Sequence, residues 1–156
     1  MILPIEDKHV DRIVFSVDLS QSPFVQVDTD LESIAYFFSC IGIHSLHLLA
    51  KCVVKRVGFG TEDSGFDYPD DLDLDEEPFE GVRFCYPPGQ TVISLKAFER
   101  MMLRYFETAQ KFAYQELQKL DIQFKNNPGW KMRPDIETQW KELTMYTQQL
   151  KKRLTE

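Results

Sequence analysis

The sequence GVRFCYPPGQTVISLKAFERMMLRYFETAQKFAYQELQKL, residues Gly81 to Leu120, decides the fold that we expect for this chain. Its first six residues alternate, with Val82, Phe84 and Tyr86 on one side, as in a half-buried strand. The residues PPGQ are typical of a turn, and TVIS then supplies the partner strand of a β-hairpin. Ser94 stands where the N-cap of a long amphipathic helix is expected.

Two apolar stripes with helical spacing predict a C-terminal helical hairpin over residues 95–154. The loop KNNPGWKMR separates them, and Pro134 is predicted to be the first residue of the last helix. The narrow stripe of that helix favours antiparallel packing on the long helix. The long helix carries Leu95, Phe98, Met102, Tyr105, Phe106, Ala109, Phe112, Ala113, Leu117 and Leu120, and the last helix carries Ile136, Trp140, Leu143, Thr147, Leu150 and Leu154.

The N-terminal third predicts two extended segments and a helix. The alternation in RIVFSVDLS, Arg12 to Ser20, indicates a strand, and residues 24–27 form a second short extended piece. Thr29 and Glu32 have the spacing of a capping box, which predicts that a helix begins there. That helix either ends at Gly42 or continues through the next apolar run.

These elements predict an α+β protein with a small, mostly antiparallel sheet packed against helices and a long C-terminal helix pair. The length of 156 residues and the apolar content of 43% fit a single domain, residues 1–156, with its own core.

The negative charge of the chain is concentrated in one window. Residues 61–80 contain ten Asp or Glu and no Lys or Arg, whereas the net charge of the whole chain is −7. Gly and Pro recur in residues 58–80, which predicts a loop or an extended segment. Phe66, Tyr68 and Phe79 lie between the acidic residues, and we expect them to pack against a surface. Two interpretations remain open: the segment lies across the basic C-terminal helices, or it is a surface for a cationic partner.

Calcium chemistry does not fit this window well. Asp71, Asp73 and Asp75 have the 1, 3, 5 spacing of an EF-hand loop. However, Glu76 stands where the turn needs glycine, and Val82 stands where a bidentate Glu is needed. The remaining interpretation for calcium is weak binding by the clustered carboxylates.

Zinc and hydrolase sites are also poorly supported. Cys40, His44 and His47 would share one face of an unbroken helix, but Gly42 interrupts it and the sequence has no Cys-x-x-Cys unit. Ser45 between the two histidines is not a catalytic triad, and no phosphate-binding glycine loop is present. We therefore expect no enzyme activity, no metal and no cofactor.

Cysteine usage and the apolar runs predict a cytoplasmic protein. Cys40, Cys52 and Cys85 are odd in number and widely spaced, as expected of buried free thiols in a reducing compartment. Charge from Glu6 onward argues against a signal peptide, and the apolar run at residues 34–50 is read as a buried helix rather than a membrane span. The acidic balance argues against nucleic-acid binding.

The block FEGVRFCYPPGQTVISLKAFERMMLRYF, Phe79 to Phe106, with the acidic stretch before it, resembles a signature of bacterial immunity proteins. These proteins protect cells from the ribonuclease toxins of contact-dependent growth inhibition systems. The resemblance implies a non-enzymatic inhibitor that binds one cognate toxin domain, and it carries over no catalytic residue.

An acidic surface of this kind imitates the field of a phosphate backbone, so it attracts a protein with a basic active site. The alternative is an adaptor or regulatory module whose acidic loop merely solvates the chain; a homodimer through the C-terminal helix pair is possible in either case. The predicted toxin-binding residues are Asp67, Tyr68, Asp70, Asp71, Asp73, Asp75, Glu76, Glu77, Phe79 and Glu80.

Overall fold

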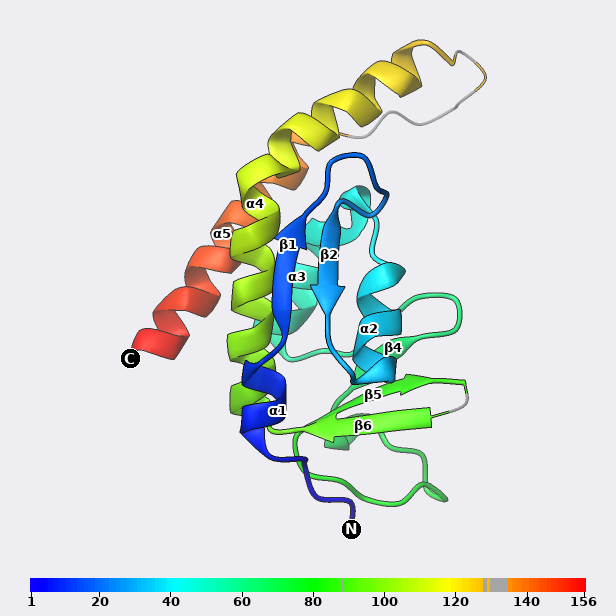
Figure 1. Ribbon diagram of the computed structural model, residues 1–156, viewed down its shortest axis with the longest axis vertical. Coiled ribbons are helices and arrows are strands. Elements are labelled where there is room, and N and C mark those ends of the chain that lie inside the picture. Colours follow the sequence, from blue (N-terminus) through cyan, green and yellow to red (C-terminus); the bar gives the residue numbers. More distant parts are fainter. Residues whose placement is uncertain (88, 128, 130–134) are drawn as a thin grey trace.

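The computed structural model describes residues 1–87, 89–127, 129 and 135–156, and it has the expected α+β fold (Figure 1). The described part of the chain contains five α-helices and two antiparallel sheets. The helices are α1 (Asp7–Asp11), α2 (Glu32–Ser39), α3 (Leu46–Lys55), α4 (Leu95–Lys125) and α5 (Ile136–Thr155), with short 3-10 helices at Ile43–Ser45 and Pro69–Asp71. The strands are β1 (Val14–Val17), β2 (Val25–Asp28), β3 (Phe59–Gly60), β4 (Gly65–Asp67), β5 (Val82–Tyr86) and β6 (Gly89–Ile93).

Each sheet is built from strands that follow one another in sequence. β1 and β2 form a two-stranded sheet, and the second sheet has the order β3-β4-β5-β6. In Figure 1 the long helix α4 runs beside both sheets, and the N-terminus lies near the four-stranded sheet. This order confirms the predicted β5–β6 hairpin, and it shows that the two extended segments predicted near the N-terminus pair with one another as β1 and β2.

The hairpin and helix of residues 81–120 are confirmed, with small shifts of boundary. The partner strand begins at Gly89, so Gly89 and Gln90 belong to β6 rather than to the turn, whereas Pro88 lies outside the described residues. The Ser94 hydroxyl accepts the Ala97 N–H at 3.1 Å, as expected of an N-cap. α4 continues to Lys125, five residues beyond the predicted end.

The predicted capping box at the start of α2 is wrong. The helix begins at Glu32 with Leu31 as its N-cap, and the Thr29 hydroxyl accepts the Leu31 N–H at 3.1 Å in a local turn instead. The Glu32 carboxylate accepts the Tyr86 hydroxyl at 2.7 Å, which ties α2 to β5. Capping-box spacing therefore located the turn before the helix but not its first residue.

The apolar run after α2 is broken and not continuous. α2 ends at Ser39, and Gly42 has extended backbone before the short 3-10 helix that leads into α3. The two helical parts, Glu32–Ser39 and Ile43–Lys55, are bent by 99° relative to one another. Among the described helices, none has by itself both the length and the apolar content to cross a membrane; this bent pair does so only when its parts are combined.

Aromatic side chains join α2, the four-stranded sheet and α4 into one core. Phe37 packs edge-on against Phe66 and Phe84, with ring centroids 5.5 and 5.2 Å apart. Phe98 of α4 contacts both of these rings, at 4.9 and 5.8 Å. Phe37, Phe84 and Phe98 have no exposed surface, so the hairpin and the long helix bury a shared face.

The C-terminal helix pair is antiparallel, as the stripes predict (Figure 1). Leu143 and Leu150 of α5 are buried, and α5 packs on α3 as well as on α4. α5 begins at Ile136 with Asp135 as its N-cap, two residues after the predicted start at Pro134, which lies outside the described residues.

A buried carboxylate links the ends of α3, α4 and α5. The Glu99 side chain is 5% exposed and pairs with Arg56 at 3.2 Å and with Arg153. Arg153 also donates to the Val54 carbonyl at 2.6 Å. Because Glu99 needs these partners inside the fold, the pairs fix the position of the C-terminal turn of α5.

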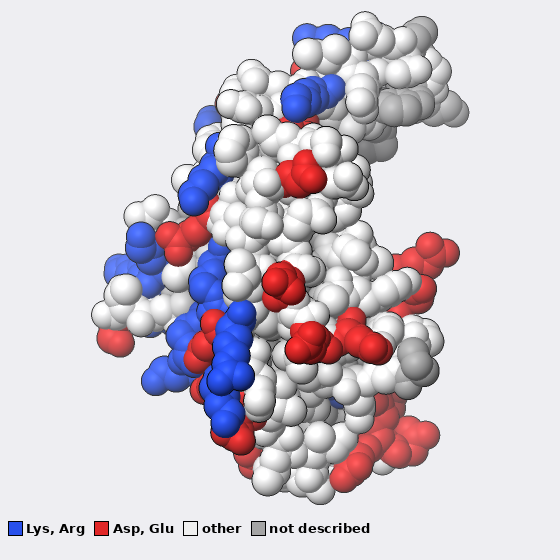
Figure 2. All heavy atoms as spheres, in the orientation of Figure 1, with Lys and Arg blue, Asp and Glu red and all other residues white. Residues whose placement is uncertain are grey.

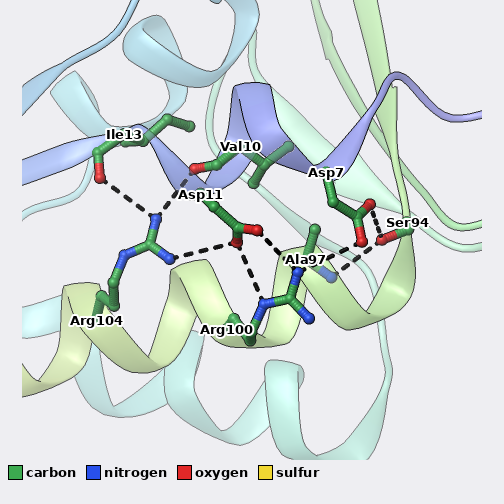
Figure 3. Close-up of polar contacts among 8 residues, drawn as sticks. All are labelled: Asp7, Val10, Asp11, Ile13, Ser94, Ala97, Arg100 and Arg104. Atoms are coloured by element: carbon green, nitrogen blue, oxygen red, sulfur yellow. Dashed lines mark hydrogen bonds and ion pairs between the residues drawn. The ribbon is translucent and has the colours of Figure 1, made fainter.

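Basic side chains gather over α4 and α5 on the left of Figure 2, where some acidic ones lie between them, and the right of that view carries mainly acidic side chains. Two of the basic side chains of α4, Arg100 and Arg104, form contacts within the fold that hold α1 against α4 (Figure 3). Arg100 pairs with Asp11 at 3.1 Å, and Arg104 donates to the carbonyls of Val10 and Ile13 at 3.1 and 3.3 Å. α1 is only five residues long, so these side-chain contacts supply much of what orders it.

Gly81 has no tolerable replacement at the start of β5. Its φ is +101°, and a Cβ there would lie 2.1 Å from the Ile93 carbonyl oxygen. We expect Gly81→Ala to lower the free energy of unfolding by about 3 kcal/mol or more, measured by urea denaturation. Gly89→Ala is the control, because its Cβ would meet nothing closer than the Tyr86 ring at 3.7 Å. Equal stabilities of the two variants would contradict this prediction.

Arg153→Gln is expected to destabilise the protein by about 2–3 kcal/mol, because the buried Glu99 carboxylate would keep only its pair with Arg56. Lys152→Gln removes the same charge from the exposed neighbouring position and should change stability by less than about 0.5 kcal/mol. Chemical denaturation measures the free energy of unfolding of both variants. Equal values would show that the ion pair between Arg153 and Glu99 does not stabilise the protein.

Candidate functional site

The acidic segment, residues 61–80, is folded and not simply a long loop. β4 and the 3-10 helix Pro69–Asp71 lie within it, and β4 pairs with β3 on one side and β5 on the other. The turn between β3 and β4 is closed by the Thr61 N–H, which donates to the Ser64 carbonyl at 2.7 Å. The expectation of a loop therefore holds only for the remaining parts of the segment.

Arg83 of β5 joins two parts of the acidic segment that are nine residues apart, Asp67 and Glu76. Its guanidinium donates to both carboxylate oxygens of Asp67, at 3.0 and 2.6 Å, and pairs with Glu76 at 2.7 Å. It also lies 4.9 Å from the centroid of the Phe79 ring. The hydrogen bond to Asp67, the largest effect, raises the pKa of Arg83, and the hydrogen bond from Arg83 lowers the pKa of Glu76.

The N-terminal residues fix the far end of the segment. The Met1 amino group lies 3.3 Å from the Glu77 carboxylate. The Ile2 N–H donates to the Pro78 carbonyl at 2.8 Å, and the Ile2 carbonyl accepts the Glu80 N–H at 3.2 Å. The described ion pairs of the segment are thus made with β5 and the N-terminus, and we find none with the basic C-terminal helices that one interpretation favoured.

Two carboxylates of the segment stabilise its own turns. Asp71 accepts the Tyr68 N–H at 3.0 Å, which begins the short 3-10 helix. Glu76 accepts the Asp73 N–H at 3.3 Å. These bonds and the pairs with Arg83 give the backbone of the segment a defined course between β4 and β5.

Most of the predicted contact residues face solvent, but the two aromatic ones do not. Tyr68 and Phe79 are 8% and 3% exposed, so in this conformation they belong to the interior and we do not retain them as anchors for a partner. Asp67 and Glu76 are half-buried because Arg83 binds them. The exposed carboxylates are those of Asp70, Asp71, Asp73, Asp75, Glu77 and Glu80.

Sequence reasoning missed the apolar side chain that the segment does expose. Leu74, between Asp73 and Asp75, is fully exposed, whereas its neighbour Leu72 is half-buried. The alternation DLDLD was the available signal, but it does not say which leucine points outward. An exposed leucine framed by carboxylates is an apolar contact point within a charged surface.

The zinc candidate is not assembled. The 99° bend between the two helical parts separates Cys40 from His44 and His47. Throughout the described ranges, no three His, Cys, Asp or Glu side chains are grouped as a metal site would require. The three cysteines are free, and burial raises the pKa of Cys52 and Cys85; Cys40 is exposed, contrary to the expectation of buried thiols.

The fold and this surface define a small α+β protein with a structured acidic face. No protein-family model, curated protein or solved structure matches the chain.

Replacement of Arg83 by Gln is expected to lower stability by about 3 kcal/mol, because Asp67 and Glu76 lose their shared cation. The effect depends on pH. Arg83 holds the pKa of Glu76 below its ordinary value, so this stabilisation is present at neutral pH and is lost as the pH falls through that lowered pKa. Denaturant titrations between pH 7 and pH 3 should therefore show a smaller acid-induced loss in Arg83→Gln than in the wild type.

Arg100→Gln is the control for this prediction. It removes the same charge from a more exposed pair with Asp7 and Asp11, and should cost about 1 kcal/mol or less. If both variants behave alike, Arg83 does not have the organising role that its contacts indicate.

Proposed function

We propose that this chain is a non-enzymatic immunity protein that binds a cognate toxin domain, a ribonuclease, and covers its basic nucleic-acid site. The observation that supports this most directly is a set of exposed carboxylates on a backbone held by Arg83 and the N-terminal residues. The resemblance of residues 79–106 to such immunity proteins supplies the kind of partner.

The charge distribution suits capture of a basic protein. Exposed carboxylates in one place accelerate encounter with a positive surface, and salt weakens this effect. Charge gives speed and orientation more than affinity, so an apolar contact is also needed. Leu74 is available for that role, in place of Tyr68 and Phe79.

The alternative is an adaptor whose acidic segment is only a solvated loop. Such a loop does not require a fixed backbone. The pairs with Arg83 and the bonds to Ile2 therefore favour a binding surface. A homodimer through the C-terminal helices would need their apolar stripes, but Leu143 and Leu150 face the chain's own core.

The experiment measures association with the C-terminal domain of the protein encoded immediately upstream, which the proposal identifies as the cognate toxin domain. Asp70, Asp73, Asp75 and Glu80 are all changed to Lys; Asp71 and Glu77 are kept because Asp71 accepts the Tyr68 N–H and Glu77 pairs with the Met1 amino group. We expect the association rate at low salt to fall at least about tenfold, while the melting temperature stays nearly unchanged.

The control variant carries the same charge change elsewhere. Glu6, Asp28, Asp30 and Glu156 are exposed and lie outside the acidic segment, so their replacement by Lys should reduce the rate much less. An unchanged rate and affinity in the first variant would exclude the acidic surface. Failure of the wild type to bind the toxin domain, and to protect cells that express it, would exclude the immunity function.

A further inference from the structure

One face of the four-stranded sheet carries two adjacent glycines near the acidic segment. In the strand register, Gly60 lies opposite Gly65, and Gly65 lies opposite Cys85. Residues directly opposite one another share a face of a sheet, and so do residues two apart in a strand, so Asp67 is on this face too. The other face of the same strands carries Phe59, Phe66 and Phe84 and packs on the core.

The glycines form the floor of a hollow on this outer face. The hollow has a volume of about 400 Å³, and its lining includes Gly58, Gly60, Gly65, Val57 and Cys85. A Cβ at Gly58 would lie 3.0 Å from the Phe66 carbonyl oxygen, so a side chain there would crowd the backbone of β4. A Cβ at Gly60 would meet only the Ser64 carbonyl oxygen, at 3.7 Å, and would project into open space. At these glycines the floor of the hollow is therefore peptide backbone.

Two carboxylates stand at the rim of this hollow. Asp67 and Asp71 both line it, and Asp71 is exposed. The cation bonded to this group is Arg83, which Asp67 shares with Glu76. Arg83 is therefore already paired with two carboxylates, and none of its charge is left for Asp71, which keeps a net negative charge at the rim of the hollow.

We propose that this hollow seats an arginine side chain of the partner protein. A guanidinium is planar and weakly hydrated, so it stacks on flat surfaces such as exposed peptide groups more readily than a lysine ammonium does. Its N–H groups are oriented to bind a carboxylate such as that of Asp71, and its aliphatic stem suits Val57 and Cys85. This assignment rests on the proposed function, since it names the chemical group of the toxin that the acidic face receives.

The first test fills the hollow without any change of charge. Gly60→Val places a β-branched side chain on the floor of the hollow, and Gly89→Val makes the same change on the edge strand β6, outside it. We expect Gly60→Val to raise the Kd for the neighbouring toxin domain at least about tenfold, and Gly89→Val to change it less than about twofold. Wild-type affinity in Gly60→Val, with folding confirmed by circular dichroism, would overturn the assignment and leave the acidic-surface mechanism standing.

The second test does not need the toxin. A short oligoarginine peptide with blocked ends is titrated into the 15N-labelled protein, with an oligolysine peptide of the same length as the comparison. We expect the arginine peptide to shift the amide signals of Gly60, Gly65 and Cys85 more than the lysine peptide does, and Gly60→Val to remove these shifts. Shifts confined to residues 70–77, equal for both peptides, would show only diffuse charge attraction and would overturn the assignment. Because this readout is independent of the toxin, it separates failure of the hollow from failure of the immunity function.

Discussion

The guanidinium of Arg83 is the contact on which the acidic face depends. The Arg83 side chain is only 8% exposed, and burial of its charge without a partner would be unfavourable. The ion pairs with Asp67 and Glu76 offset this desolvation penalty. Because Asp67 ends β4 and Glu76 lies after the 3-10 helix, the single cation ties both ends of the intervening chain to β5. The remaining carboxylates then face water on a backbone that is already in place, which lowers the entropy lost on binding.

A second buried charge of opposite sign organises the helical side of the molecule. Glu99 of α4 is paired by Arg56 at the end of α3 and by Arg153 near the end of α5. The Arg83 and Glu99 clusters are built in the same way. In each, one buried charged side chain forms ion pairs with residues from segments that are distant in sequence. Ion pairs of this kind are directional, so they set the placement of segments that apolar burial alone would leave free to slide.

The glycines of residues 58–65 add a feature that charge does not provide. Between the aromatic face of the sheet, which is buried, and the carboxylates at its rim, they leave a shallow surface of peptide groups. An acidic surface attracts any cation, whereas a hollow with a flat floor and two carboxylates at its rim discriminates by shape. The proposed function thus combines a general field for encounter with one local site for recognition.

The sequence by itself determined the fold class, the β5–β6 hairpin, the Ser94 cap and the two C-terminal helices, because these rest on local periodicity and on capping chemistry. It also located the acidic segment and most of its exposed carboxylates. Only the tertiary structure decided that Tyr68 and Phe79 turn inward, that Leu74 turns outward, and that Arg83 binds Asp67 and Glu76. The glycine-floored hollow was hidden for the same reason: strand pairing between residues 59–67 and 82–86 creates it, and the register of distant segments is set by the shared core and not by either segment alone.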